Sequence, residues 1–322
     1  MAMNASGVLA ETVAGRPIMG SFHGCYSISA AIGSLIGGLL TSLEWGTSDI
    51  FLLMCALGTA ANMVCGQGLY HRDDERMIEK RAAFKSTEHD VDAAAQLAEA
   101  PTFMIPSGPA LYVCAVGFLG SFGEGSMVTW CIIYFKDILN ASSLNATVGF
   151  SLFMVFMGLG RFSCDKIREF IGRRRLVRYE GILVLVGFLL LVLAPSVGPS
   201  VLSLSTACLG CIFAGSGIST IIPTVFSTAG RLPGQHAGSA IATAAAIAYA
   251  GSIVSPILIG VLSDGMGSLR WALLLDGLLL SLMTPLSYGI PKEIEKYDPL
   301  LCDDEERKLN SEFNDEEEVI LG

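Results

Sequence analysis

The sequence predicts an all-α, multi-pass transmembrane helical bundle of about eight spans. Of its 322 residues, 52% are hydrophobic and only 16% are charged, whereas soluble domains carry about 25% charged residues. The charges are also concentrated in short segments, which leaves long stretches without any. One such segment, Gly160–Arg178, holds seven of the twenty Lys and Arg residues between two apolar runs. A dense cationic turn of this kind is typical of a short cytoplasmic loop.

Eight segments, with a few flanking residues each, are apolar and long enough to cross a bilayer, since a spanning helix needs about 20 mostly apolar residues. In chain order they are Gly20–Leu43, Ile50–Tyr70, Ala110–Tyr134, Val148–Gly160, Gly181–Ala194, Val201–Phe226, Gly238–Leu262 and Trp271–Ile290. The polar stretches between them divide the chain. We predict a partial N-terminal bundle of two spans (1–70), a cytoplasmic linker (71–108), a C-terminal six-helix bundle (109–291) and an acidic, disordered cytoplasmic tail (292–322).

The distribution of cations predicts that both termini are cytoplasmic. Eighteen of the twenty Lys and Arg residues fall on the side of the basic segment, and Lys136 and Arg270 fall on the other side. Positive residues are retained on the cytoplasmic side of a membrane. Two glycosylation sequons, at Asn140 and Asn145, lie in a loop that this orientation places outside. The sequence leaves open whether the protein is in the plasma membrane or an endomembrane.

Five motifs follow one another along the chain. They are Gly15–Gly24, Glu124–Tyr134, Gly160–Arg174, Gly217–Arg231 and Ala237–Gly267. In this order they resemble the entry to the fifth helix, the seventh helix, the loop between the eighth and ninth helices, the tenth helix and the eleventh helix of the major facilitator superfamily. The resemblance is strongest to its branch near the fucose permeases and the MosC-type bacterial membrane proteins.

The resemblance implies both a fold and a mechanism. Members have twelve helices in two bundles, which give alternating access to a site near the midplane. On this comparison the chain lacks the first three to four helices, either through an incomplete gene model or through a true truncation. Thr129 stands where this branch is expected to have an acid.

Two ionisable residues, Glu124 and Asp276, lie well inside predicted spans. Such groups usually face the bundle interior or a water-filled cavity. Glu124 stands among glycines, which allow close approach of helices and local unwinding. We predict that Glu124 binds the substrate or a coupling proton, the alternative being a packing role. Asp276, His23 and Tyr134 are further candidates for the cavity, each with a structural alternative.

The basic segment is predicted to act as a conformational latch. The carboxylate of Asp165 suits a bidentate guanidinium partner. Arg161 lies four residues before it, and Arg173 and Arg174 follow it directly after Gly172. A contact that forms in one conformation and breaks in the other would bias alternating access. The alternative is that these arginines only set the topology.

These features predict secondary active transport, as a symporter, of a small polar solute that is sugar-like by analogy and proton-coupled through Glu124. The alternative is a truncated, non-transporting membrane protein or an assembly partner. No Gly-x4-Gly-Lys-Ser/Thr motif occurs, so ATP-driven transport is disfavoured. No cluster of catalytic residues occurs within the spans, so we do not expect an enzyme.

No cofactor, metal ion or nucleic acid is expected as a partner; the expected partners are the solute and the lipid bilayer. Cys208 and Cys211 have the spacing of a metal or redox motif. They lie in an apolar helix without His or acidic neighbours, so we predict that they only pack. The oligomeric state is left open.

Overall fold

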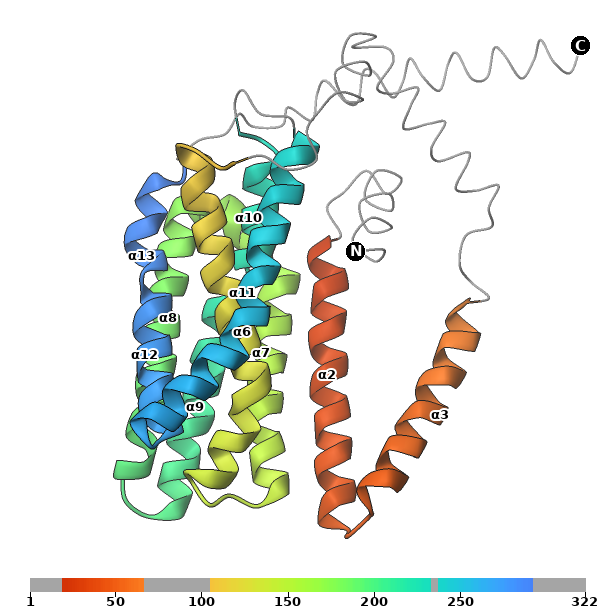
Figure 1. The fold of residues 1–322 in the computed structure, drawn as a ribbon. Helices are drawn as coiled ribbons and strands as arrows, with labels where there is room; N and C mark the ends of the chain where they lie inside the picture. Colours follow the sequence, from red (N-terminus) through yellow and green to blue (C-terminus); the bar gives the residue numbers. More distant parts are fainter. Residues whose placement is uncertain (1–18, 67–104, 233–236, 292–322) are drawn as a thin grey trace, which may run out of the picture. The chain divides into compact units, whose positions relative to one another are not determined.

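The computed structural model describes residues 19–66, 105–232 and 237–291, and within these ranges all regular structure is helical (Figure 1). The helices are α2 (Met19–Ser42), α3 (Thr47–Gly66), α6 (Pro109–Asp137), α7 (Ser143–Ile171), α8 (Arg173–Leu193), α9 (Ser200–Ile218), α10 (Ile221–Ala229), α11 (Ala237–Met266), α12 (Leu269–Ser281) and α13 (Met283–Leu286), with 3-10 turns η1 (Ala194–Ser196) and η2 (Ser287–Gly289). Most of the predicted linker and the whole predicted tail (292–322) lie outside the described residues.

Eight helical segments in the described part of the chain are long and apolar enough to cross a membrane, as predicted. α2 and α3 supply the first two and form a hairpin (Figure 1). The sixth crossing, Ser200–Ala229, is divided into α9 and α10. The eighth, Leu269–Gly289, is divided into α12, α13 and η2. The predicted all-α transmembrane bundle is confirmed.

The basic segment Gly160–Arg178 is helical almost throughout, so the prediction of a loop there is wrong. α7 continues to Ile171 and α8 begins at Arg173, which leaves Gly172 alone between them. Gly172 has a φ of 80°, in the left-handed region that glycine adopts without steric cost. α7 has 29 residues, so its length of about 43 Å exceeds a hydrocarbon core of about 30 Å. Its cationic end can therefore remain helical outside the core.

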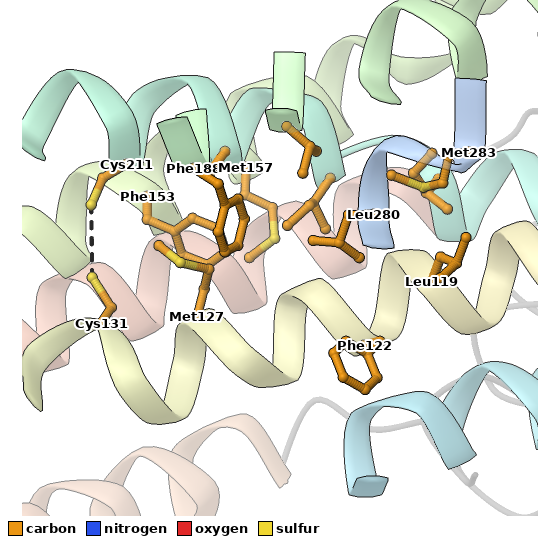
Figure 2. Close-up of a cluster of buried hydrophobic side chains, with 14 of the residues drawn as sticks. Leu119, Phe122, Met127, Cys131, Phe153, Met157, Phe188, Cys211, Leu280 and Met283 are labelled. Atoms are coloured by element: carbon orange, nitrogen blue, oxygen red, sulfur yellow. Dashed lines mark hydrogen bonds between the residues drawn. The ribbon is translucent and has the colours of Figure 1, made fainter. Parts of the chain in front are cut away.

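Aromatic and methionine side chains fill the space between α6, α7 and α8 (Figure 2). Phe153 and Met157 of α7 lie in this core with Met127 of α6 and Phe188 of α8, and all four are fully buried. Helices in a bilayer gain little from hydrophobic exclusion and associate largely through van der Waals packing. This core therefore sets the relative positions of the helices that carry the polar site.

Cys211 of α9 contacts Cys131 of α6, with the two sulfur atoms 3.7 Å apart (Figure 2). Both thiols are free and buried. Within the described ranges, no three His, Cys, Asp or Glu side chains gather in a way that could hold a metal ion. The thiol pair is a contact between α6 and α9.

α2 packs along α7 through small residues. A Cβ atom added at Gly20 would lie 2.8 Å from the carbonyl oxygen of Arg161. Further along the two helices, Ser151 donates its hydroxyl to the carbonyl of Ala31 at 3.0 Å. Small residues let helix backbones approach closely within a membrane. The close approach brings polar groups of α2 beside α7 at the level of Arg161.

Candidate functional site

The candidate site is an ion pair between Glu124 of α6 and Arg161 of α7. Arg161 Nη2 lies 2.7 Å from Glu124 Oε2, the distance of a charge-assisted hydrogen bond. The Arg161 side chain is 3% exposed and that of Glu124 is 21% exposed. Isolated charges within a membrane span are costly, and pairing offsets much of that cost. The carboxylate remains reachable from solvent, whereas the guanidinium does not.

Arg161 also joins α7 to α2. Its Nη1 donates to Ser27 Oγ at 2.8 Å and approaches the carbonyl oxygen of His23 at 3.5 Å. Ser27 donates its own hydroxyl to the same carbonyl at 3.1 Å. The half-buried His23 imidazole lies near the ion pair, and its Nε2 has no hydrogen-bond partner in the described part of the chain. One guanidinium therefore holds groups from three helices together.

The glycines around Glu124 serve close packing in a continuous helix. α6 is unbroken along its length, so the local unwinding suggested by the sequence is not seen. A Cβ atom added at Gly123 would lie 2.6 Å from the Leu280 side chain, and one at Gly125 would lie 2.8 Å from the carbonyl oxygen of Ser252. α12 and α11 thus press directly against the turn that carries Glu124.

Asp276 has a partner that sequence reasoning could not name. It is buried in α12 and accepts a hydrogen bond from the hydroxyl of Ser126 in α6. Its Oδ1 has no partner among the described residues. Ser126 follows Glu124 by two positions, and residues at that spacing do not share a helix face. The structure therefore does not bring Asp276 into the Glu124–Arg161 pair.

Tyr134, a candidate for the cavity, is fully buried. Its hydroxyl donates to the carbonyl oxygen of Leu191, which ties α6 to α8. Trp130, one turn earlier, is half-buried and donates its Nε1–H to the carbonyl of Pro256 at 3.2 Å. Trp271, near the start of α12, is exposed.

Asp165 does not bond to Arg161. It pairs with Arg168 of its own helix at 2.5 Å, on a partly exposed surface. Arg161 instead points to α6 and α2, as its bonds show. The predicted contact between these two latch residues is therefore absent from the described conformation.

The remaining latch residues lie at the junction of α7 and α8. Gly172 separates the two helices, and Arg173 and Arg174 begin α8. Arg173 Nη2 donates to Ser227 Oγ at 3.4 Å, and Arg174 Nε donates to the carbonyl of Ile290 at 2.8 Å. These bonds connect the start of α8 to α10 and to the end of the last crossing.

The two sequon asparagines lie at the opposite end of α7. Asn140 is exposed in the turn before the helix, with a φ of 51°. Asn145 is exposed in the first helical turn, and its backbone N–H donates to Ser142 Oγ at 3.2 Å. Both side chains are accessible in this conformation.

Two charged groups were not predicted to be buried. They are the guanidinium of Arg161 and the carboxylate of Glu180. The usable signal in both cases was a charge next to the end of an apolar run. Arg161 follows the run that ends at Gly160, and Glu180 precedes the run that begins at Gly181. Each was therefore assigned to the loop rather than to a helix.

A bundle of membrane-crossing helices contains a buried ion pair between two of them, and the arginine of the pair also bonds to a third. This arrangement defines a polytopic membrane protein with an internal polar site. The model of the Major Facilitator Superfamily matches residues 16–241, and the chain belongs to this superfamily. Its members are membrane transporters and not enzymes, so the prediction that the chain is not an enzyme is confirmed.

Three curated proteins are similar to this chain. An uncharacterised MFS-type transporter of Yersinia pestis is 25% identical over 272 residues, which cover 82% of this chain and 62% of that protein. An uncharacterised transporter of Sinorhizobium fredii is 23% identical over 287 residues, or 89% of this chain and 69% of that protein. The membrane protein MosC of Rhizobium meliloti is 23% identical over 152 residues, or 47% of this chain and 36% of that protein. The chain thus spans about three fifths of the Yersinia relative's length.

Proposed function

We propose that this protein carries out secondary active transport of a small polar solute by alternating access, with the Glu124–Arg161 pair at the solute and proton site. The observation that carries the proposal is that one buried guanidinium bonds to both α6 and α2. Alternating access needs contacts that hold one conformation and break in the other. Membership of a transporter family supports transport in general, and the bonds of Arg161 supply a contact of the required kind.

The proposal divides the described chain into two moving parts. α2 and α3 form the partial N-terminal bundle, and α6 to α13 form the six-span C-terminal bundle. α2 meets α7 at the boundary, where Arg161 bonds to Ser27 and approaches the carbonyl of His23. If α2 moves away from α7, these bonds break while the Glu124–Arg161 pair stays within the second bundle. The pair can therefore keep its ligand during the movement.

The pair offers complementary groups to a sugar-like solute. A carboxylate accepts hydrogen bonds and a guanidinium donates them, so together they suit neighbouring hydroxyls. A proton on Glu124 Oε2 removes the ionic partner of Arg161 and releases its Nη2 to the solute. Because the carboxylate is 21% exposed, the proton can later leave to water. Solute and proton would then move together, as in a symporter.

Glu124→Gln is expected to fold and reach the membrane but to lose solute uptake or its dependence on a pH gradient. Gln keeps the size and most of the hydrogen-bonding capacity of Glu and removes the titratable proton. Uptake of a panel of sugars is measured in vesicles with and without a pH gradient. Both this chain and a chain extended at its N-terminus by helices taken from the Yersinia relative are used. Asp137→Asn, which removes an exposed carboxylate at the end of α6, is the matched control.

Gradient-dependent uptake by Glu124→Gln at the wild-type rate would reduce Glu124 to a packing residue. If wild-type chains of both lengths insert normally and take up none of the solutes, a non-transporting membrane protein or assembly partner becomes the better explanation. Loss of uptake in the Asp137→Asn control as well would show that the assay reports general damage.

We also propose that both termini face the cytoplasm, because of the distribution of cations along the chain. An epitope placed in residues 73–99 should react with antibody only after the cells are permeabilised. One placed in residues 140–145 should react on intact cells. Reaction of the first epitope on intact cells would reverse the orientation.

A further inference from the structure

Glu180 of α8 is a buried carboxylate that pairs with no cation among the residues the structure describes. Its side chain is 2% exposed, and neither of the ion pairs in the described part of the chain includes it. Its Oε1 accepts the backbone N–H of Thr220 at 3.0 Å and also accepts the Thr220 hydroxyl. Its Oε2 has no hydrogen-bond partner among the described residues. A carboxylate at membrane depth is costly unless its charge is compensated, and here one oxygen lacks its partner.

The carboxylate is aimed at a break in a membrane crossing. α9 ends at Ile218 and α10 begins at Ile221, and both belong to one crossing. Thr220, which bonds to Glu180, precedes the first turn of α10. The N-terminus of a helix carries a partial positive charge and unpaired N–H groups, so it attracts a carboxylate. In membrane transporters, breaks of this kind expose backbone groups that coordinate ions.

The walls around Glu180 are close and neutral. A Cβ atom added at Gly217 of α9 would lie 2.8 Å from the carbonyl oxygen of Glu180. The buried Cys164 of α7 lies near the carboxylate. The hydroxyl of Thr224 lies one turn beyond Thr220 on the same face of α10. No charged side chain of α9, α12 or α13 bonds to Glu180 within the described ranges. Among the described residues, therefore, no charged group supplies the missing partner of the carboxylate.

We propose that Glu180 and the break between α9 and α10 form a binding site for a small monovalent cation, H⁺ or Na⁺, separate from the Glu124–Arg161 pair. A proton needs only Glu180 Oε2. Na⁺ takes oxygen ligands, which the carboxylate and the hydroxyl of Thr220 can supply, with Thr224 one turn further along α10. Either cation neutralises a charge that the described residues leave uncompensated.

The two sites lie against the same turn of α7. Gly160 packs against Ser219 of the break so closely that an added Cβ atom would overlap the serine hydroxyl. Arg161 is the next residue, and its side chain points roughly 100° around the helix, toward Glu124. A rearrangement of the break when the cation leaves therefore acts directly on the turn that holds Arg161.

The test measures the thermal unfolding midpoint of the purified full chain. NaCl is replaced by choline chloride at constant ionic strength, and the titration is repeated across a pH series. If Na⁺ is the ligand, it should raise the wild-type midpoint by a few degrees; if the proton is the ligand, the midpoint should rise as the pH falls, with no preference for Na⁺. Glu180→Gln, which keeps an acceptor for Thr220, should lose the response, and Thr220→Val should weaken it. Asp137→Asn should keep it.

Equal Na⁺ and pH responses in the wild type and Glu180→Gln would overturn the proposal. So would a wild type that responds to neither cation, which is informative even if Glu180→Gln does not fold. Loss of uptake in Glu124→Gln with the cation response intact would show that the two sites are distinct. An intact cation response in a chain that transports nothing would overturn the proposed function and leave the cation site standing.

Discussion

Arg161→Gln is expected to abolish uptake and to give the largest loss of stability among the variants of the ion pair. Breaking a buried ion pair by removing one member typically costs about 3–5 kcal/mol. Glu124 keeps some contact with solvent, so the loss should lie near the lower end of that range. The bond to Ser27 is lost as well, which loosens α2 from α7 at this level.

Two matched variants isolate the role of the guanidinium. Arg161→Lys keeps the charge, but one ammonium cannot reproduce a planar fork whose two Nη atoms bond to Glu124 and Ser27. It should recover part of the stability and little of the uptake. Arg168→Gln removes the cation of the partly exposed pair with Asp165 and should change stability by less than about 1 kcal/mol. Unfolding midpoints in detergent and vesicle uptake are the two measurements.

The double variant Glu124→Gln/Arg161→Gln tests whether the two charges act as a pair. Residues in direct contact show coupling energies of about 0.5–3 kcal/mol. The double variant should therefore be less destabilised than the sum of the two single variants, because neither charge is left alone. Additive losses would mean that the 2.7 Å contact does not stabilise the protein.

The membrane crossings could be predicted because they depend on local composition. Eight apolar segments were expected, and eight helices of suitable length and hydropathy are found in the described residues. Their ends could not be predicted equally well. α7 runs through Arg161 and on to Ile171, because a helix that leaves the bilayer needs no further apolar residues to continue. Hydropathy therefore predicts where an apolar run ends, but not where the helix ends.

Glu124 was found because a carboxylate inside a long apolar run stands out in the sequence. Its partner was not found, because Arg161 stands among six other cations of the basic segment. Nothing local separates the one fully buried arginine from the more exposed cations around it. The partners of Asp276 and Glu180 could not be predicted either, since Ser126 is 150 residues from Asp276 and Thr220 is 40 residues from Glu180. Such pairs depend on which helix faces lie together.

The close-packing glycines illustrate the same limit. Gly33 and Gly37 have the four-residue spacing that favours close contact between helices. In α2 nothing lies within 4 Å of a Cβ atom added at either position. At Gly215 of α9, by contrast, an added Cβ atom would lie 2.3 Å from the carbonyl oxygen of Phe153 in α7. Spacing shows that small residues share a face, but not which helix, if any, that face meets.

Gly215→Ala is therefore expected to destabilise the protein strongly, although alanine favours a helix more than glycine does. The intrinsic preference gains up to about 1 kcal/mol. Overpacking a tight contact typically costs about 1–3 kcal/mol and occasionally more. Here the obstructing atom is a backbone oxygen, which cannot turn aside as a side chain would, so α7 and α9 must separate. The steric loss should exceed the gain.

Gly33→Ala is the matched control, because it makes the same chemical change in open space. It should leave the unfolding midpoint unchanged or raise it slightly, by the helix preference alone. The two variants should thus shift the midpoint in opposite directions, and Gly215→Ala should also reduce the fraction of protein that elutes as a single species in detergent. A midpoint for Gly215→Ala at or above that of Gly33→Ala would mean that α7 and α9 are further apart than described. The positions of Phe153 and Arg161 relative to α9 would then need revision, because both depend on that contact.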